Sequence, residues 1–307
     1  MHAVVTGATN GIGAAIARRL AGEGLTVTLV GRSDQRLRAA RERIAAAVPG
    51  AELVLERADL AELAQVRDLA ERLLSGSAPD VVISNAALVT PLDRRTSDGL
   101  PRVLAVNHLA PYLLLRALAA ALDRARLIVV GSDPVSLALE PVDLDDFPLA
   151  HPERLGEPAG LRPYYAYART KNMNTMFVYA LARRLAGTAI TVNACHPGLI
   201  SGTGLSREVP GLGELIKQAY RDGIFPQPGP QPGGGRWAPG SSGPKDRPGP
   251  DIGADTPAWL ATSPTVEGVT GSFFVDRIAV QTAPHTTDPE RCERVWHDSA
   301  ALVGLSP

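Results

Sequence analysis

The 307-residue chain has few of the residues and runs that mark several classes of protein. It contains two cysteines, Cys195 and Cys292, which are too few for a disulfide framework, and no cysteine–histidine spacing is typical of zinc. No window reaches the roughly 18 apolar residues of a membrane span. No basic and apolar leader precedes the first expected strand. These absences predict a reduced protein of the cytoplasm, with no membrane segment and no metal site.

An excess of positive charge is also lacking. The 32 acidic residues balance 31 basic ones, for a net charge of −1, so a nucleic-acid partner is not expected. Lysine is scarce: Lys171, Lys217 and Lys245 are the three lysines, and the other 28 basic residues are arginines. This bias is typical of a GC-rich genome, and it makes a single arginine weak evidence for any site.

Apolar runs alternate with helical stretches along most of the chain. This alternation favours a parallel sheet with helices on both faces, so we expect residues 1–307 to form one Rossmann-type, doubly wound α/β domain. The predicted strands cover residues 3–6, 25–30, 52–57, 81–84, 127–130, 190–194 and 272–276, and the predicted helices cover 11–21, 34–47, 62–74, 100–122 and 165–186.

Two segments interrupt this pattern. Residues 140–163 carry five prolines and are expected to form an inserted loop. In residues 226–250, 15 of 25 are glycine or proline, which excludes a regular helix or strand. One interpretation is a surface linker. The other is a lid over the substrate region, spanning about 204–256, with Trp237 as an apolar anchor.

A glycine-rich turn lies between the first expected strand and the first expected helix. Glycines at this position allow a tight turn, and the helix start offers free N–H groups to a pyrophosphate. The strand–turn–helix context is the one required of a dinucleotide-binding loop. The candidate cofactor-binding residues here are Gly7, Thr9, Asn10, Gly11, Ile12 and Gly13.

The end of the second strand indicates which nicotinamide cofactor binds. NAD-binding proteins place an acidic residue there for the ribose 2′-OH, whereas an arginine accommodates the 2′-phosphate of NADP. Gly31 stands at the acidic position, and Arg32 and Ser33 follow it, which favours NADP(H) over NAD(H). Asp34 is an alternative ribose ligand, but we expect it to cap the next helix.

Tyr167 and Lys171 are four residues apart and therefore lie on one helix face. A tyrosine hydroxyl has a pKa of about 10, and a nearby ammonium lowers it, so the pair could move a proton on or off a carbonyl oxygen. So short a motif also arises by chance. Tyr164 and Tyr165 lack a lysine at this spacing and are expected to form pocket walls or packing.

Further motifs make the resemblance to a known family plain. The glycine loop, an Asn-Ala pair, an Asn in a long helix, a Ser after the fifth strand and Tyr-x3-Lys occur in the order of the short-chain dehydrogenase/reductases, over essentially the whole length. The subgroup resembles the retinol dehydrogenase-like reductases. The residues that carry it are 6–13, Asn85-Ala86, Asn107, Ser132, Tyr167 and Lys171 for the family, and 106–109, 193–198 (NACHPG) and 269–276 (VTGSFFVD) for the subgroup.

The resemblance implies a role for each matching residue. Tyr167 would be the general acid or base, Lys171 would lower its pKa and bind the nicotinamide ribose, and Ser132 would hold the substrate oxygen. Asn107 would position a water in a proton relay. Asp59 and Leu60 would border the adenine, Asn85 and Ala86 the adenosine ribose, Pro197 and Gly198 the nicotinamide, and Thr203 its carboxamide. The chain departs from the pattern at Ala87 and Gly131, which replace a Gly and a Ser, and Thr203 falls one residue late.

The expected function is NADP(H)-dependent reduction of a ketone or aldehyde, or oxidation of the corresponding alcohol. An apolar, bulky substrate is expected, and a step of secondary metabolism is one hypothesis. Alternatives are C=C reduction, epimerisation or dehydration on the same fold, or a non-catalytic NADP-binding protein. Family members often form homodimers through their two long helices, here 100–122 and 165–186. The acidic cluster Asp143, Asp145 and Asp146 is expected to be a solvated turn rather than a metal site.

Overall fold

The computed structural model describes residues 1–133, 141–200, 202–225 and 249–307, and one eight-stranded sheet lies at its centre. The strand order is β3-β2-β1-β4-β5-β6-β7-β8, and every neighbouring pair is parallel except β7 and β8. The strands are β1 (His2–Thr6), β2 (Thr26–Gly31), β3 (Leu53–Arg57), β4 (Val81–Ser84), β5 (Arg124–Val130), β6 (Ala189–His196), β7 (Phe273–Val275) and β8 (Ile278–Val280).

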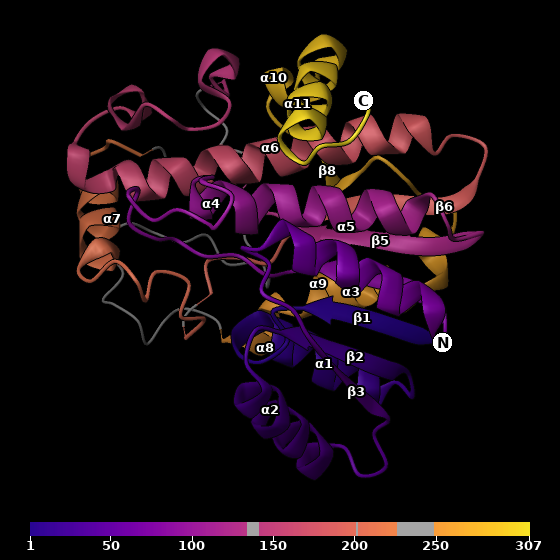
Figure 1. The fold of residues 1–307 in the computed structure, drawn as a ribbon. Helices are drawn as coiled ribbons and strands as arrows, with labels where there is room; N and C mark the ends of the chain where they lie inside the picture. Colours follow the sequence, from indigo (N-terminus) through magenta and orange to yellow (C-terminus); the bar gives the residue numbers. More distant parts are fainter. Residues whose placement is uncertain (134–140, 201, 226–248) are drawn as a thin grey trace.

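Helices cover both faces of the sheet, which confirms the doubly wound α/β fold (Figure 1). α1, α2 and α9 contribute to one hydrophobic core, and α3, α5 and α6 contribute to the other. The helices are α1 (Gly11–Gly22), α2 (Asp34–Ala47), α3 (Leu63–Ser75), α4 (Arg102–Leu104), α5 (Ala110–Ala119), α6 (Arg162–Arg184), α7 (Leu212–Arg221), α8 (Pro250–Gly253), α9 (Asp255–Thr262), α10 (Pro284–Thr287) and α11 (Pro289–Leu302).

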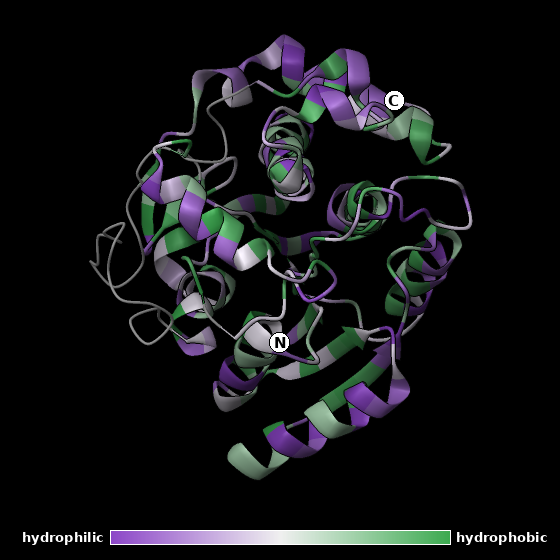
Figure 2. Ribbon diagram, turned by 90° about the vertical axis from the view of Figure 1, so that its left-hand side faces the viewer, coloured by the Kyte–Doolittle hydropathy of each residue, from purple (hydrophilic) through white to green (hydrophobic). Residues whose placement is uncertain are grey.

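The central strands are apolar because neither of their faces meets water. All four residues of β4 are buried, and β1 is buried from Ala3 to Thr6. In register, Val4 of β1 lies opposite Thr28 of β2 and Val82 of β4. Figure 2 shows hydrophobic residues concentrated in the strands, with hydrophilic ones on the outer sides of helices. Such runs are typical of parallel sheets.

The single helix expected at residues 100–122 is divided into three elements. A π-helical turn, Ala105–Leu109, separates α4 from α5. This turn carries Asn107. Its side-chain oxygen accepts a hydrogen bond from the Leu88 amide, and its side-chain NH₂ donates one to the Leu88 carbonyl, both at 2.9 Å. π-Helical turns within helices are frequent at functional sites. Hydrophobic periodicity does not distinguish such a turn from an uninterrupted helix.

α11 was absent from the sequence-based prediction and packs on α6 (Figure 1). Trp296 of α11 stacks on Phe177 of α6 with ring centroids 6.0 Å apart, and its carbonyl accepts a hydrogen bond from Tyr112 of α5. Trp296 therefore contacts both helices that were expected to pair in a homodimer, and the homodimer itself stays a prediction. Asp288, which caps α11 by accepting from Arg291, was a usable signal for this helix.

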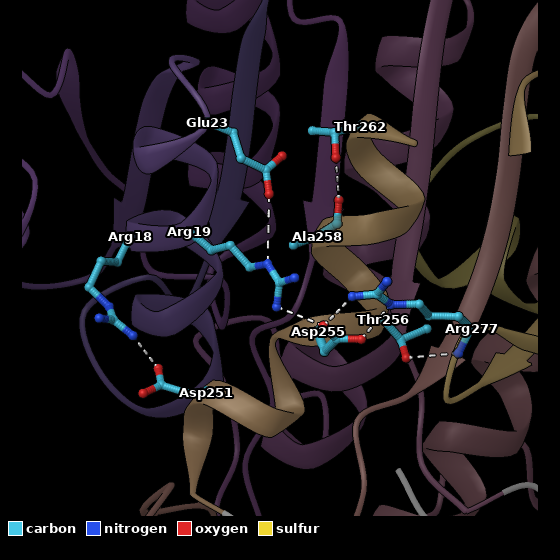
Figure 3. Close-up of polar contacts among 9 residues, drawn as sticks. All are labelled: Arg18, Arg19, Glu23, Asp251, Asp255, Thr256, Ala258, Thr262 and Arg277. Atoms are coloured by element: carbon cyan, nitrogen blue, oxygen red, sulfur yellow. Dashed lines mark hydrogen bonds and ion pairs between the residues drawn. The ribbon is translucent and has the colours of Figure 1, made fainter. Parts of the chain in front are cut away.

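A network of ion pairs joins α1 to α8, α9 and the β7–β8 turn (Figure 3). The Asp255 carboxylate accepts hydrogen bonds from Arg19 at 2.7 Å and from Arg277 at 2.5 and 2.6 Å. Arg18 pairs with Asp251 at 2.5 Å. α8, α9 and the β7–β8 turn are thus attached to α1, the helix that follows the glycine-rich loop.

The expected loop at 140–163 contains three short 3-10 turns, and α6 begins at Arg162. The prediction of a solvated acidic turn is wrong for Asp146, which is 1% exposed. Asp146 accepts from the amides of Ala150 and His151, so burial of its charge is compensated by hydrogen bonds. In the described parts of the chain, no group of His, Cys, Asp or Glu residues could hold a metal ion.

The second predicted loop, about 204–256, contains α7 and α8 at its flanks. Residues 226–248, including Trp237, lie outside the described residues, so the predicted lid is untested there. Within the described ranges, no helix has both the length and the apolar character needed to cross a bilayer.

Candidate active site

A cavity of about 680 Å³ opens at the carboxyl ends of β1, β2, β4, β5 and β6. This edge is where open α/β sheets bind ligands, next to the point at which strand order reverses between β1 and β4. Every predicted site residue lines the cavity except Gly11 and Asn107. The lining residues are Gly7, Thr9, Asn10, Ile12, Gly13, Arg32, Ser33, Asp59, Leu60, Asn85, Ala86, Ser132, Tyr167, Lys171, Pro197, Gly198 and Thr203.

The glycine loop has the close packing that a dinucleotide cradle needs. Gly7 has φ +68°, a conformation that side chains rarely adopt. A Cβ on Gly13 would lie 2.4 Å from the carbonyl oxygen of Gly7, so no other residue fits there. α1 begins at Gly11 and directs its free N–H groups and positive dipole end toward the loop. These features fit the pyrophosphate of a dinucleotide.

Thr6 ties the glycine loop to the loop after β4. Its hydroxyl accepts the backbone N–H groups of Asn85 at 3.0 Å and Ala86 at 3.1 Å. The Asn85 side-chain amide donates to the Thr6 carbonyl oxygen at 2.9 Å. The Asn-Ala pair therefore borders the cavity because it is attached to the residue before Gly7.

At the end of β2, a Cβ on Gly31 would lie 2.8 Å from the Thr9 methyl group, so a larger residue would displace that side chain. Arg32 borders the cavity with its side chain 45% exposed. The predicted cap is wrong by one residue: Ser33 caps α2 by accepting from the amide of Arg36. Asp34 instead lies in the first turn, 3.8 Å from Arg57, where it complements the helix dipole.

Tyr167 and Ser132 form the chemical centre of the cavity. The Tyr167 hydroxyl shares a hydrogen bond with Ser132, which lowers the pKa of the tyrosine, but burial outweighs this and raises its pKa to about 12. Tyr164 stacks on Tyr167 with centroids 5.9 Å apart and lines the cavity, so it is a pocket wall as predicted. The Tyr167 hydroxyl is thus held protonated, with a pKa above the range in which proton transfer near neutral pH is most efficient.

Lys171 is buried one helical turn after Tyr167. Its ammonium donates to the carbonyl oxygen of Val130 at 2.8 Å and lies 5.7 Å from the centre of the Tyr167 ring. Burial lowers the pKa of Lys171 to about 8 and raises that of the neighbouring Cys195 to about 12. In this arrangement Ser132, rather than Lys171, lowers the pKa of Tyr167, so the role predicted for the lysine stays a prediction.

Asn107 connects the catalytic helix to the loop after β4 and does not line the cavity. Besides bonding Leu88, its side chain donates to Thr170 at 3.2 Å, and its backbone carbonyl accepts from Asn174 at 2.8 Å. These bonds position Leu88, which does line the cavity. The predicted water relay at Asn107 is not tested by them.

Several lining residues were not predicted. Residues 202–209, here called the strap, cross the cavity after β6 and bring Glu208 to the cofactor region, while α7 contributes Lys217 and Tyr220. Thr203, expected at the nicotinamide, lies beside the phosphate loop, where its carbonyl accepts from Asn10 at 3.4 Å. Apolar walls complete the cavity: Leu88, Val89, Val106, Leu199, Ile200, Leu205 and Ile216.

Comparison with known proteins identifies the family. The chain is 34% identical, over 98% of its length and 92% of the relative's, to DnrU of Streptomyces sp. (strain C5), which is named as a candidate daunorubicin C-13 ketoreductase. It belongs to the short-chain dehydrogenase/reductase family. The short chain dehydrogenase family model matches residues 1–135. Human retinol dehydrogenase 14 is 30% identical over 98% of this chain and 86% of its own, in agreement with the retinol dehydrogenase-like subgroup.

One solved structure shares the fold of this chain. A blue fluorescent protein from a metagenomic library, in complex with NADPH, is 27% identical, with a TM-score of 0.60 over 89% of this chain and 95% of that one. As a short-chain dehydrogenase/reductase, this chain is an oxidoreductase that acts on carbonyl or alcohol substrates with a nicotinamide cofactor.

Proposed function

We propose that the protein is an NADP(H)-dependent carbonyl reductase or alcohol dehydrogenase. The observation that carries this proposal is the hydrogen bond between Tyr167 and Ser132, at the end of a cavity that also contains the glycine loop and the buried Lys171. A non-catalytic protein has no physical need to keep these three groups together in one cavity.

The protein's own residues account for the proton and the substrate oxygen. The cofactor, when bound, supplies or accepts the hydride. Ser132 holds the substrate oxygen by a hydrogen bond and stabilises the charge that develops on it. Tyr167 Oη donates its proton to that oxygen in reduction and takes it back in oxidation. Lys171 supplies a positive charge beside the tyrosine ring.

The preference for NADP(H) rests on the end of β2. Arg32 and the amide-rich start of α2 border the cavity, Arg36 lines it as well, and Gly31 leaves no carboxylate at the position that binds the NAD ribose. A relative of similar fold in complex with NADPH supports this assignment.

The substrate proposed is apolar and bulky. The cavity that contains Tyr167 has aliphatic and aromatic walls, which include Val106, Leu205, Ile216 and Tyr220 and contribute to binding by burial of apolar surface. The name of the Streptomyces relative, a candidate daunorubicin C-13 ketoreductase, supports a ketone as substrate and a role in secondary metabolism.

A substrate screen that follows NADPH absorbance tests the function, with bulky aryl and polycyclic ketones, small aldehydes and activated enones as probes. The expected result is NADPH consumption with the ketones and an alcohol as product. Reduction of the enone C=C bond alone, or conversion of substrate without net NADPH consumption, would contradict the proposal.

A further inference from the structure

The strap carries a carboxylate to the region proposed for the adenosine 2′-phosphate. Glu208 Oε1 lies 3.9 Å from the Arg32 guanidinium. Its other oxygen, Oε2, accepts the Thr90 hydroxyl at 2.9 Å and an Arg102 nitrogen at 3.2 Å. Glu208 therefore bridges the β2 end of the cavity and the segment that follows β4.

Two backbone contacts hold the strap in this position independently of Glu208. The Val89 amide donates to the Leu205 carbonyl at 2.9 Å, and the Asn10 side-chain amide donates to the backbone carbonyl of Thr203 at 3.4 Å. Because Thr90 and Arg102 also hold Oε2, the carboxylate stays beside Arg32 whether or not Oε1 keeps its contact. A phosphate that reaches Arg32 must therefore share this space with a fixed negative charge.

We propose that Glu208 determines the affinity for the cofactor's 2′-phosphate by competing for Arg32. The inference rests on the proposed use of NADP(H). Without cofactor, Oε1 of Glu208 balances the positive charge of Arg32. When a 2′-phosphate arrives, Arg32 exchanges the carboxylate for the phosphate, while Thr90 and Arg102 retain Glu208. The exchange lowers affinity for NADP(H) relative to a site with Arg32 alone, and it leaves NAD(H), which has no 2′-phosphate, almost unaffected.

Glu208→Gln is the variant that tests this competition. A glutamine oxygen still accepts from Thr90 and Arg102, so the strap keeps its anchor and only the negative charge is removed. Asp298→Asn is the matched control, because Asp298 pairs with Arg294 at 2.8 Å on α11 and neither residue lines the cavity. The measurement is the Kd of NADPH and of NADH by calorimetry, with each full-length protein.

For Glu208→Gln we expect the NADPH Kd to fall about threefold to tenfold, the range of a partly exposed charge contact, and the NADH Kd to change less than about twofold. Raising the salt concentration from 0.05 to 0.5 M should shrink the NADPH difference, because ions screen the repulsion. A merely structural role for Glu208 would not give this salt dependence. The control should bind both cofactors like the wild type.

An unchanged NADPH Kd, or an equal gain for both cofactors, would overturn the competition. A selective loss of NADH affinity would also overturn it, because Glu208 would then be a ribose ligand. Arg32→Gln separates this failure from failure of the proposed function. If Arg32→Gln leaves NADPH binding unchanged, Arg32 does not bind the phosphate and the NADP(H) assignment is wrong. If it weakens NADPH binding while Glu208→Gln has no effect, only the competition is wrong.

Discussion

The Lys171 ammonium donates a hydrogen bond to the carbonyl oxygen of Val130, the last residue of β5, two residues before Ser132. This bond attaches α6, which carries Tyr167, to the strand end that carries the serine. Lys171 is one of three lysines in a chain that otherwise uses arginine. A compact ammonium fits this buried position, whereas a guanidinium is a wider planar group with five donors to satisfy.

Lys171→Arg should therefore lower kcat/KM by about 100-fold or more, because displacing a catalytic group by about 1 Å has an effect of that size. Steady-state kinetics at saturating cofactor checks it. Circular dichroism and NADPH binding of the variant show whether the loss is confined to catalysis. Activity within a few-fold of the wild type would show that the ammonium is not specifically required.

The charge of Lys171 should disappear near pH 8. Burial lowers its pKa to about 8, so the ammonium is present below that pH and is lost above it. With three lysines, ε-¹³C-lysine NMR can follow it, using Lys171→Met to assign the signal. Reductase kcat/KM, which reports the free enzyme, should fall over the same range. Titration of this signal near pH 10.4, the usual lysine value, would contradict the burial described here.

Trp296→Ala should lower the free energy of unfolding by about 3–5 kcal/mol, the usual cost of truncating a large buried aromatic residue. Trp296 is 3% exposed, stacks on Phe177 and packs against the guanidinium of Arg184 at 3.9 Å. Urea denaturation measures the change. Arg294→Ala, on the exposed side of α11, should cost less than about 0.5 kcal/mol. A similar small cost at Trp296 would show that α11 is not packed against α5 and α6 through this side chain.

Asp255→Asn should destabilise the protein at pH 7 by about 1–2 kcal/mol, because it breaks charge-assisted hydrogen bonds that are only partly exposed. The Arg277 hydrogen bond, followed by that of Arg19, lowers the pKa of Asp255 (Figure 3). Its stabilisation is therefore complete above the unfolded value of about 3.9 and is lost as pH falls through the folded value. Thermal unfolding should show wild type and variant converging below about pH 4. A difference that persists at pH 2 would exclude an ionic origin.

The parts of the site predicted from sequence are those that depend on neighbours along the chain. The glycine loop follows from a strand, a turn and a helix in succession, and Tyr167 and Lys171 share a helix face through their spacing. The same holds for the first strands and helices of the fold. The sheet order and the cavity then follow from the parallel crossovers.

The contacts that sequence reasoning missed join distant segments. Glu208 and Arg32 are 176 positions apart in the sequence, and no periodic pattern in the strap indicates their contact. α11 was missed although Asp288 and Pro289 are ordinary start signals and its apolar residues recur with helical periodicity; its packing on α6 is the part that the local pattern does not indicate. β8 has three residues, two of them exposed, and so shows no alternation.

The central claim is that the Tyr167 hydroxyl transfers the proton to or from the substrate oxygen, and that the site binds the cofactor without the help of this hydroxyl. Tyr167→Phe removes only the hydroxyl, so the measurement is turnover of a ketone found in the screen together with the NADPH Kd of the same variant. We expect kcat to fall by about 100-fold to 10,000-fold, the contribution of a positioned general acid, with an NADPH Kd within about threefold of the wild type. Turnover retained at wild-type rates, with NADPH still bound, would contradict the account.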